Sequence, residues 1–292
     1  MANLKEIRMR IVSVSSTMQI TSAMKMVSAA KLKRATDAIT RMRPYAEKLQ
    51  EILSNVSSTL DSTDGIYSQQ RDVKKVLVVA ITSNRGLCGG FNNNVLKEVR
   101  ASIRTTYANA QVDVVSLGKK AFDAFRKTEH HTTAGISETP YAIFDSLTFN
   151  NASAIAENLM GHFAAGKYDK IVLVYNSFKN AASQVIKNEQ FLPVLPSESA
   201  ASKGSSVDYI YEPNKETILE DLIPRSLKIQ LFKALLDSNA SEHGARMTAM
   251  HKATDNAGEM VKELKLTYNK ARQAAITGEI LEIVAGAEAL NG

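Results

Sequence analysis

Apolar residues recur through the first sixty residues at spacings that alternate between three and four. The series starts at Leu4, and its only members that are not apolar are Thr21, Lys25 and Ser28. A 3-4 spacing sustained over this length is typical of a coiled-coil seam rather than of the broader apolar stripe of a globular helix. The full series is Leu4, Ile7, Ile11, Val14, Met18, Thr21, Lys25, Ser28, Leu32, Ala35, Ile39, Met42, Ala46, Leu49, Leu53, Val56 and Leu60.

A helix carrying this seam would be roughly 85–90 Å long at 1.5 Å per residue, whereas a compact domain of this chain length is only about 40 Å across. We therefore expect it to extend beyond a compact domain and to need a partner. The same stepping through the C-terminal third reaches Met250, Ala253, Ala257, Met260, Leu264, Thr267, Ala271, Ala274, Gly278, Leu281 and Ala285. Because small residues here leave room for the larger ones of the first seam, an antiparallel helical hairpin is predicted. Two unrelated helices in a bundle are the alternative.

Between the two seams, the period changes to that of buried strands alternating with helices. Near-continuous apolar runs at 75–82, 112–117 and 170–175 are typical of strands buried on both faces. Two further strands, around 183–187 and 189–195, are expected to pair as a hairpin. Helices are expected at 95–107, 119–127 and 152–165, the last capped by Asn150 or Asn151. The alternation predicts a small, mostly parallel α/β sheet.

The chain is therefore divided into an N-terminal coiled-coil helix at 1–61, an α/β domain at 72–210 and a C-terminal coiled-coil helix at 211–292. Pro44 is expected to kink the first helix, because the seam resumes beyond it, and Pro224 to kink or delay the last helix. From Ile276 to Leu290, apolar residues occur on nearly every side. One partner helix cannot cover such a surface, so this end is expected to lie in a sleeve formed by other chains.

Composition narrows the class of protein. No run approaches the ~20 apolar residues of a membrane-spanning helix, and Cys88 is the only cysteine. An internal disulfide is therefore excluded, which fits a reducing compartment. Residues 1–50 carry a net charge of +7, whereas the remainder of the chain carries −1. A basic helix of this kind suits nucleic acid, anionic lipid or an acidic protein surface, or simply a solvated face.

The glycine-rich loop at 85–91 (RGLCGGF) follows a predicted strand and precedes a helix, as phosphate-binding loops do. It lacks the Gly-Lys-Ser/Thr of a Walker motif, and its glycines do not have the G-x-G-x-x-G spacing. A tight turn or a protein-contact loop is therefore favoured over a nucleotide site. Arg85 could lower the pKa of Cys88, but no general base is at hand, so a packed thiol is favoured over a nucleophile.

No metal site or catalytic group is indicated elsewhere. His130 and His131 have no cysteines or paired carboxylates at metal spacing, and His243 and His251 are eight residues apart rather than four. Nucleic-acid binding would depend on charge alone, because Tyr45 is the only aromatic residue of the basic first helix and a stacking platform is absent.

Several stretches, in order along the chain, together resemble the gamma subunits of F-type ATP synthases. They are KEIR at 5–8, ITSAMKMV at 20–27, RPYA at 43–46, RGLCGG at 85–90 and YNKARQAAIT at 268–277, with further matches at 241–247 and 253–256. The resemblance covers both ends, the inserted domain and the total length. It implies the fold already predicted, with a Rossmann-like α/β domain between the coiled-coil helices.

The resemblance also implies a function, that of the central rotor shaft of a bacterial, proton-translocating ATP synthase. The coiled coil would turn inside a ring of three alpha and three beta subunits, and its base, with an epsilon subunit, would ride on the membrane c-ring. Rotation would force the catalytic sites through different nucleotide affinities. The shaft would have no catalytic residue, cofactor or metal of its own and would bind no nucleic acid. It would lie peripherally on the cytoplasmic face of the bacterial inner membrane.

Contacts between rotor and stator follow from the matching motifs. Arg272 and Gln273 resemble residues that form a catch with beta-subunit loops. Met24 and Arg246 resemble residues that couple rotation to catalysis, and Lys25 lies beside Met24 where the shaft meets acidic loops. A further set resembles a loop that touches a beta subunit, namely Arg85, Gly86, Leu87, Cys88 and Gly89.

Gly278 and Leu281 depart from the family pattern, which has Lys or Gln and a small hydroxyl residue at these places. From the residues alone, three other functions stay open. One is a nucleotide-dependent enzyme that uses the glycine loop, which ATP binding by the isolated chain would favour. Another is a coiled-coil scaffold or basic nucleic-acid binder, which salt-sensitive DNA binding would favour. The third is a gamma chain that works mainly in an ATP-driven proton pump.

Overall fold

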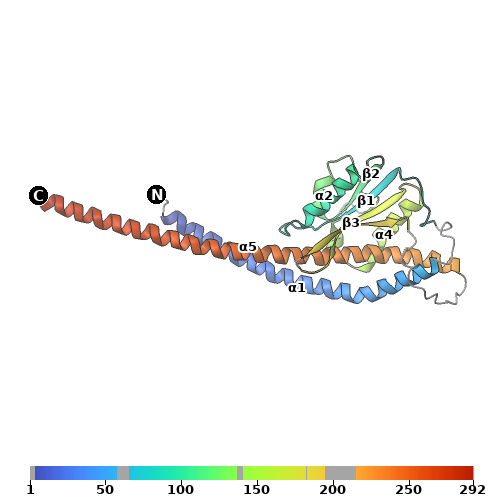
Figure 1. Cartoon of the computed structure of the whole chain (residues 1–292), viewed down its shortest axis with the longest axis horizontal. Helices are drawn as coiled ribbons and strands as arrows, with labels where there is room; N and C mark the ends of the chain where they lie inside the picture. The colour runs from blue at the N-terminus through green and yellow to red at the C-terminus, as the bar shows by residue number, and fades with distance from the viewer. Residues whose placement is uncertain (1–3, 58–65, 137–140, 182, 195–214, 292) are drawn as a thin grey trace. The chain divides into compact units, whose positions relative to one another are not determined.

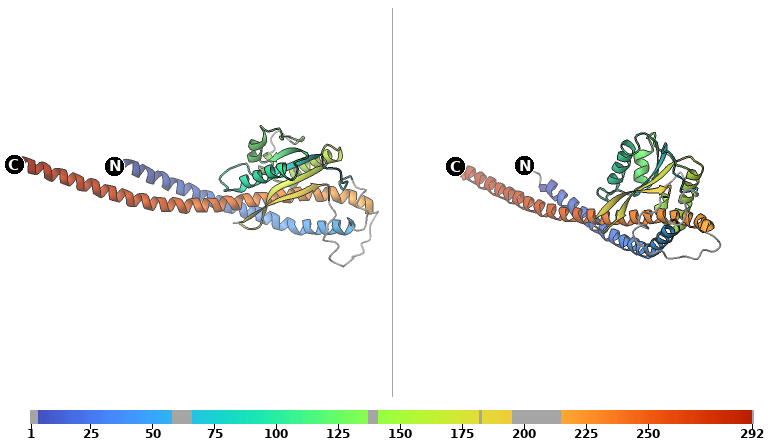
Figure 2. Two further views of the ribbon diagram at one scale, coloured as in Figure 1. Left: turned by 45° about the horizontal axis from the view of Figure 1, so that its top comes forward. Right: turned by 45° about the vertical axis from the view of Figure 1, so that its right-hand side comes forward.

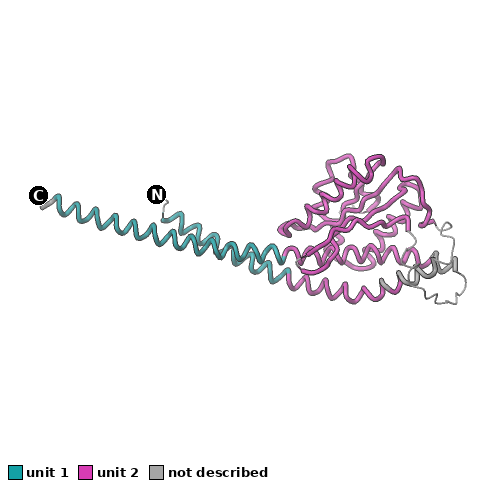
Figure 3. The backbone as a smooth tube through the Cα atoms, viewed as in Figure 1, with its two compact units in different colours: residues 1–28, 247–292 teal, residues 29–246 magenta. Residues whose placement is uncertain are grey.

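The computed structural model describes residues 4–57, 66–136, 141–181, 183–194 and 215–291. Two long helices, α1 (Leu4–Ser57) and α5 (Lys215–Asn291), flank all the other elements in the sequence. The chain forms two compact units, one of residues 1–28 with 247–292 and one of residues 29–246 (Figure 3). Both long helices contribute to both units. The predicted class, two long terminal helices with an inserted α/β domain, is confirmed.

The second unit contains a four-stranded sheet in the order β2-β1-β3-β4 (Figure 1). Its strands are β1 (Lys75–Ile81), β2 (Gln111–Leu117), β3 (Lys170–Phe178) and β4 (Gln184–Leu192). β1 is parallel to both β2 and β3, and β4 is antiparallel to β3. The prediction of a mostly parallel sheet is therefore confirmed.

Helices cover both faces of this sheet, because successive residues of the buried strand β1 point to opposite sides. Helices α2 (Phe91–Arg104) and α3 (Lys119–Phe125) pack against the even-numbered residues of β1. Helix α4 (Phe149–Ala164) and residues 227–235 of α5 pack against the odd-numbered ones, with the short 3-10 turn η1 (Ala142–Phe144) at their side. The α/β domain is thus a three-layered core in which α5 is itself one of the covering helices.

Three local predictions in this domain are wrong. The strands expected at 183–187 and 189–195 are one continuous strand, β4, because Asn188 pairs with Val174 of β3 instead of turning back. The cap of α4 is Thr148, whose hydroxyl accepts a hydrogen bond from the Asn151 backbone N at 3.4 Å. Helix α2 begins at Phe91 rather than at the expected Val95, so the last residue of the glycine-rich stretch at 85–91 is already helical.

In the first unit, α1 and α5 pair in antiparallel fashion. Thr254 donates a hydrogen bond to Thr21 at 2.8 Å, and one turn farther along α1 and one turn back along α5, Lys25 lies against His251. Along α1, every predicted seam position from Leu4 to Leu49 is buried or half-buried, which confirms the first seam. The side chains at 53, 56 and 60 lie outside the described residues. The parts of α1 and α5 that form this unit lie side by side (Figures 1 and 2).

The seam of α5 differs from the prediction after Ala257. Val261 is buried while Met260 is 50% exposed, and Tyr268 is half-buried while Thr267 is exposed. Residues seven apart return to the same face of a coiled-coil helix. The predicted positions Ala257, Leu264, Ala271 and Gly278 are accordingly buried or half-buried, whereas the predicted positions between them, Met260, Thr267 and Ala274, are exposed. From Arg272 to Ala289, every residue of α5 is exposed except the half-buried Gly278.

The prolines do not interrupt either helix. Helix α1 continues through Pro44, and α5 begins at Lys215, so Pro224 does not delay its start. The predicted boundaries at 61 and at 210–211 lie outside the described residues.

Within the second unit, α5 carries ionisable side chains that are buried, such as Asp237, or half-buried, such as His243. Burial lowers the pKa of His243 to about 4, and the positive charges of Arg246 and Lys31 add to the effect. His243 is therefore neutral near pH 7. On the same helix, burial raises the pKa of Asp237.

Gly118 should be intolerant of any side chain. It joins β2 to α3 at φ +121°, and an added Cβ would lie 2.1 Å from the Thr82 carbonyl oxygen. We expect Gly118→Ala to lower the free energy of unfolding by about 2–4 kcal/mol, because the backbone at the end of β1 must shift. Urea unfolding followed by circular dichroism measures this. The control is Gly161→Ala on α4, where nothing lies within 4 Å of the added carbon; it should be neutral or stabilising by up to about 1 kcal/mol. Equal effects of the two changes would contradict the prediction.

His243 should make the chain sensitive to acid. The unfolded chain binds this proton near pH 6.5, whereas the folded chain resists it down to about pH 4, so stability is lost as the pH falls through that window. We expect His243→Gln to reduce the loss by about 1 kcal/mol, or roughly 2–4 °C in Tm. Thermal unfolding at pH 7.5 and pH 4.5 measures it, and the pH 7.5 value corrects for lost packing. An identical Tm difference in both proteins would exclude this role.

Candidate functional site

The glycine loop between β1 and α2 has an unusual backbone. Leu87 and Gly89 both have left-handed conformations, with φ 61° and φ 59°. For leucine this costs about 1–2 kcal/mol, and such a conformation persists only where its surroundings hold it. The Leu87 side chain is 66% exposed, so burial of Leu87 itself does not provide the compensation.

One side of the loop is held by Asn92 of α2. Its carboxamide oxygen accepts hydrogen bonds from the backbone N and the hydroxyl of Ser83, both at 3.0 Å. Its amide nitrogen donates to the Cys88 sulfur at 3.1 Å. Cys88 is only 2% exposed, and burial raises the pKa of its thiol. Cys88 is thus a packed, buried thiol, as predicted.

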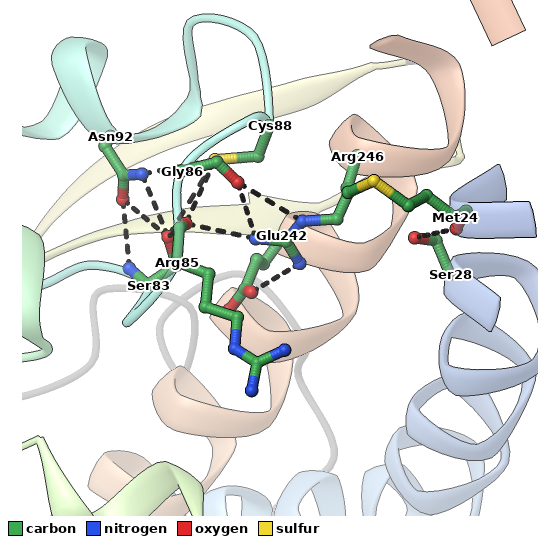
Figure 4. A network of polar contacts seen from close by, with 9 residues as sticks. All are labelled: Met24, Ser28, Ser83, Arg85, Gly86, Cys88, Asn92, Glu242 and Arg246. Atoms are coloured by element: carbon green, nitrogen blue, oxygen red, sulfur yellow. Dashed lines mark hydrogen bonds and ion pairs between the residues drawn. The ribbon is translucent and has the colours of Figure 1, made fainter. Parts of the chain in front are cut away.

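The other side of the loop is held by Arg246 of α5, as Figure 4 shows. Its Nη2 donates to the carbonyl oxygens of Arg85 at 3.1 Å and of Gly86 at 3.2 Å, and its Nε donates to the Gly86 oxygen at 3.4 Å. One guanidinium thus binds two consecutive carbonyl groups directly before Leu87. The structure brings together the predicted residues at 85–89 and Arg246, which are about 160 residues apart in sequence.

Glu242 completes this group, and sequence reasoning did not assign it a role. Its Oε1 lies 2.6 Å from Nη1 of Arg246, and both side chains are only about a tenth exposed. Burial raises the pKa of Glu242, which the charges of Arg246, Lys31 and Arg85 oppose. The spacing of four residues on a predicted helix is the sequence signal that could have indicated this ion pair.

A second polar group lies in the first unit, between α1 and α5. The Nζ of Lys25 donates to Nδ1 of His251 at 3.3 Å, and a carboxylate oxygen of Asp255 lies 3.4 Å from the same nitrogen. Beside Lys25, the carbonyl oxygen of Met24 accepts a hydrogen bond from Ser28 at 2.7 Å. Met24 and Lys25 are half-buried, so both lie partly in the helix–helix contact.

Arg272 and Gln273 are exposed and lie apart from these two groups. Along α5 they follow His251 by about 30 Å, at 1.5 Å per residue. They precede a stretch of exposed apolar side chains, namely Ile276, Ile280, Leu281, Ile283 and Val284, each between 47% and 70% exposed.

None of these groups has the composition of a catalytic or metal centre. Among the described residues, no three His, Cys, Asp or Glu side chains are gathered as a metal site would require. No described helix has an apolar stretch long enough to cross a membrane. The polar contacts instead hold backbone and helices in place.

Comparison with known proteins gives a consistent result along the whole chain. The family model described as ATP synthase matches residues 3–290. The ATP synthase gamma chain of Flavobacterium johnsoniae is 65% identical, and that of Cytophaga hutchinsonii is 53% identical, each over the full length of both chains.

Solved structures agree on the fold. A chain from the central stalk and c-ring of the Tetrahymena thermophila mitochondrial ATP synthase is 29% identical, with a TM-score of 0.55 over 80% of this chain and 99% of that chain. A chain from the rotor of the Euglena gracilis mitochondrial ATP synthase is 23% identical, with a TM-score of 0.64 over 94% of this chain and 98% of that chain, and it supports the fold alone. With relatives this similar over their full length, the chain belongs to the gamma-chain family of ATP synthases.

Proposed function

We propose that this chain is the central rotor shaft of a bacterial F-type ATP synthase. It couples proton-driven rotation of a c-ring to ATP synthesis and hydrolysis at sites on the alpha and beta subunits, and it has no catalytic residue of its own. Membership of the gamma-chain family supports this function, as does similarity to a central-stalk chain at 29% identity. The structural observation that carries it is the exposed apolar end of α5.

That end needs a cover that one helix cannot provide. Its large apolar side chains, such as Ile280 and Ile283, are more than half exposed. The antiparallel register places Leu4, the first described residue of α1, near Ala271, well before these side chains. A helix with apolar residues on several sides requires neighbours on several sides, and soluble proteins rarely expose such patches without a partner. A ring of three alpha and three beta subunits provides such a sleeve.

The other partners follow from the same function. The base of the shaft binds an epsilon subunit and the c-ring, so the chain is peripheral to the membrane on the cytoplasmic face of the bacterial inner membrane. The basic first fifty residues, with a net charge of +7, suit acidic loops of the beta subunits.

Contacts with the stator are assigned to the motif residues. Arg272 and Gln273 form the catch with beta-subunit loops, and their exposure supports this role. Met24 and Lys25 meet acidic loops of the beta subunits, and the loop at 85–89 touches a beta subunit. Arg246 is only 8% exposed and its donors face the loop, so its effect on coupling passes through the loop.

The assembly itself is the first test. Native mass spectrometry of the tagged chain, purified from a membrane extract, should show one copy with three copies each of the alpha and beta chains, and the same fraction should hydrolyse ATP. A lone chain or a self-dimer without ATPase activity would overturn the shaft function and would favour a scaffold.

Arg272→Ala should impair synthesis without impairing assembly. Hydrogen bonds to charged groups are worth about 1.5–3 kcal/mol, and about 1.4 kcal/mol at the limiting step changes a rate tenfold, so we expect roughly a tenfold slower ATP synthesis in reconstituted vesicles. Lys265→Ala is the control, because this exposed cation lies two turns earlier on the same helical face. Unchanged synthesis in the assembled Arg272→Ala complex would count against the catch.

A further inference from the structure

Leu87 is a large apolar side chain presented outward by a loop with little freedom. It is 66% exposed, and its left-handed φ of 61° makes it one of only two non-glycine residues with positive φ in the described part of the chain. Strained residues of this kind cluster where function requires a fixed geometry. An exposed apolar side chain on a rigid base also suits an anchor that fills a pocket on a partner, because little conformational freedom is lost on binding.

The backbone that leads into Leu87 is fixed by one side chain. Arg246 donates three hydrogen bonds to the carbonyl groups of the two preceding residues, Arg85 and Gly86. The backbone that follows is fixed by burial of Cys88 under Asn92. The path into Leu87 therefore depends on where the guanidinium of Arg246 lies.

Glu242 determines the position of that guanidinium. The fork of an arginine is planar, so binding at one nitrogen fixes the direction of the other donors. The carboxylate of Glu242 binds Nη1 at 2.6 Å, which leaves Nε and Nη2 directed at the loop (Figure 4). Three cations act on this carboxylate, namely Arg246, Lys31 and Arg85. The adjacent His243 is neutral near pH 7 and adds no charge. Loss of the carboxylate would leave the buried guanidinium without an acidic partner, and Arg246 would then turn away from the loop.

We propose that Glu242 is a positioning residue for coupling: it orients Arg246, which holds the loop at 85–89 so that Leu87 anchors in an apolar pocket of a beta subunit. The inference rests on the proposed function, because contact of this loop with the stator is itself proposed. The part played by Glu242 can nevertheless be measured on the chain alone.

Cys88 provides the measurement, because it is the only cysteine of the chain and is buried by the loop conformation. The rate at which N-ethylmaleimide alkylates Cys88 in the folded full-length chain reports on loop opening. We expect Glu242→Gln and Arg246→Gln each to raise this rate at least tenfold, and the double variant to be no faster than Arg246→Gln. Additive effects would mean that Glu242 does not act through Arg246, and an unchanged rate in Glu242→Gln would overturn the proposal.

The matched control is Asp237→Asn. Asp237 is also a buried carboxylate on α5, 4% exposed against 8% for Glu242, but it accepts a hydrogen bond from Ser177 of β3 rather than holding the loop. Its variant should leave the alkylation rate unchanged, and a similar increase would show general loosening instead of positioning. If Glu242→Gln does not fold, Glu242→Asp takes its place, because it keeps the charge but is one methylene shorter. It should give a rate of Cys88 alkylation between those of the parental chain and Arg246→Gln. An alkylation rate equal to the parental one would overturn the proposal.

The assembled complex tests the anchor. In reconstituted vesicles, Glu242→Gln and Leu87→Ala should both reduce the number of protons pumped per ATP hydrolysed by at least twofold, while Asp237→Asn should not. An unchanged number of protons pumped per ATP in Leu87→Ala would overturn the anchoring role of Leu87. Failure of the parental chain to assemble with alpha and beta subunits would instead overturn the proposed function, and the alkylation rates would still decide whether Glu242 positions the loop.

Discussion

An apolar helical surface must be covered, and the structure of this chain depends on how α5 meets that requirement. The apolar residues between 227 and 235 are covered by the sheet. Leu236 and Ala240 are covered by Ala35 and Ile39 of α1. Ala257 and Val261 are buried in the helix pair of the first unit. The last part of α5 keeps its apolar side chains exposed. Because burial is the main driving force of both folding and association, the same helix that organises the fold also requires a partner.

Polar groups inside these contacts fix the register of the packing, which apolar side chains alone leave open. Apolar seams with small residues tolerate alternative registers, whereas a buried polar pair is satisfied in only one. Thr21 with Thr254 is such a pair, because it joins α1 to α5 in the first unit. In the second unit, Glu242 pairs with Arg246 within α5, and the hydrogen bonds of Arg246 to the carbonyl oxygens of Arg85 and Gly86 fix how the helix meets the loop that carries Leu87.

The electrostatics of the molecule suit a mechanical part rather than a catalyst. Enzymes shift pKa values to activate a nucleophile or a base, but here burial raises the pKa of the Cys88 thiol, and His243 is kept neutral. The raised pKa leaves little thiolate at Cys88 near pH 7, and the lowered pKa makes the neutral His243 a weak base. In the loop at 85–89, which resembles a phosphate-binding loop by its position after a strand, the carbonyl oxygens of Arg85 and Gly86 accept hydrogen bonds from the guanidinium of Arg246.

The sequence by itself determined the elements of the fold, because the spacing of apolar residues is a local property: the α1 seam from Leu4 to Leu49 and the strands β1 to β3 were predicted within a few residues. Recognisable motifs also named the loop and Arg246, although not Glu242. Only the tertiary structure decided that Val261 rather than Met260 is buried, since adjacent apolar residues are equivalent in a sequence and the partner helix selects between them. It likewise decided that β4 pairs with β3 and that Arg246 binds the loop. Contacts between residues far apart in the sequence leave no periodic signal, because they are fixed by the packing of whole elements.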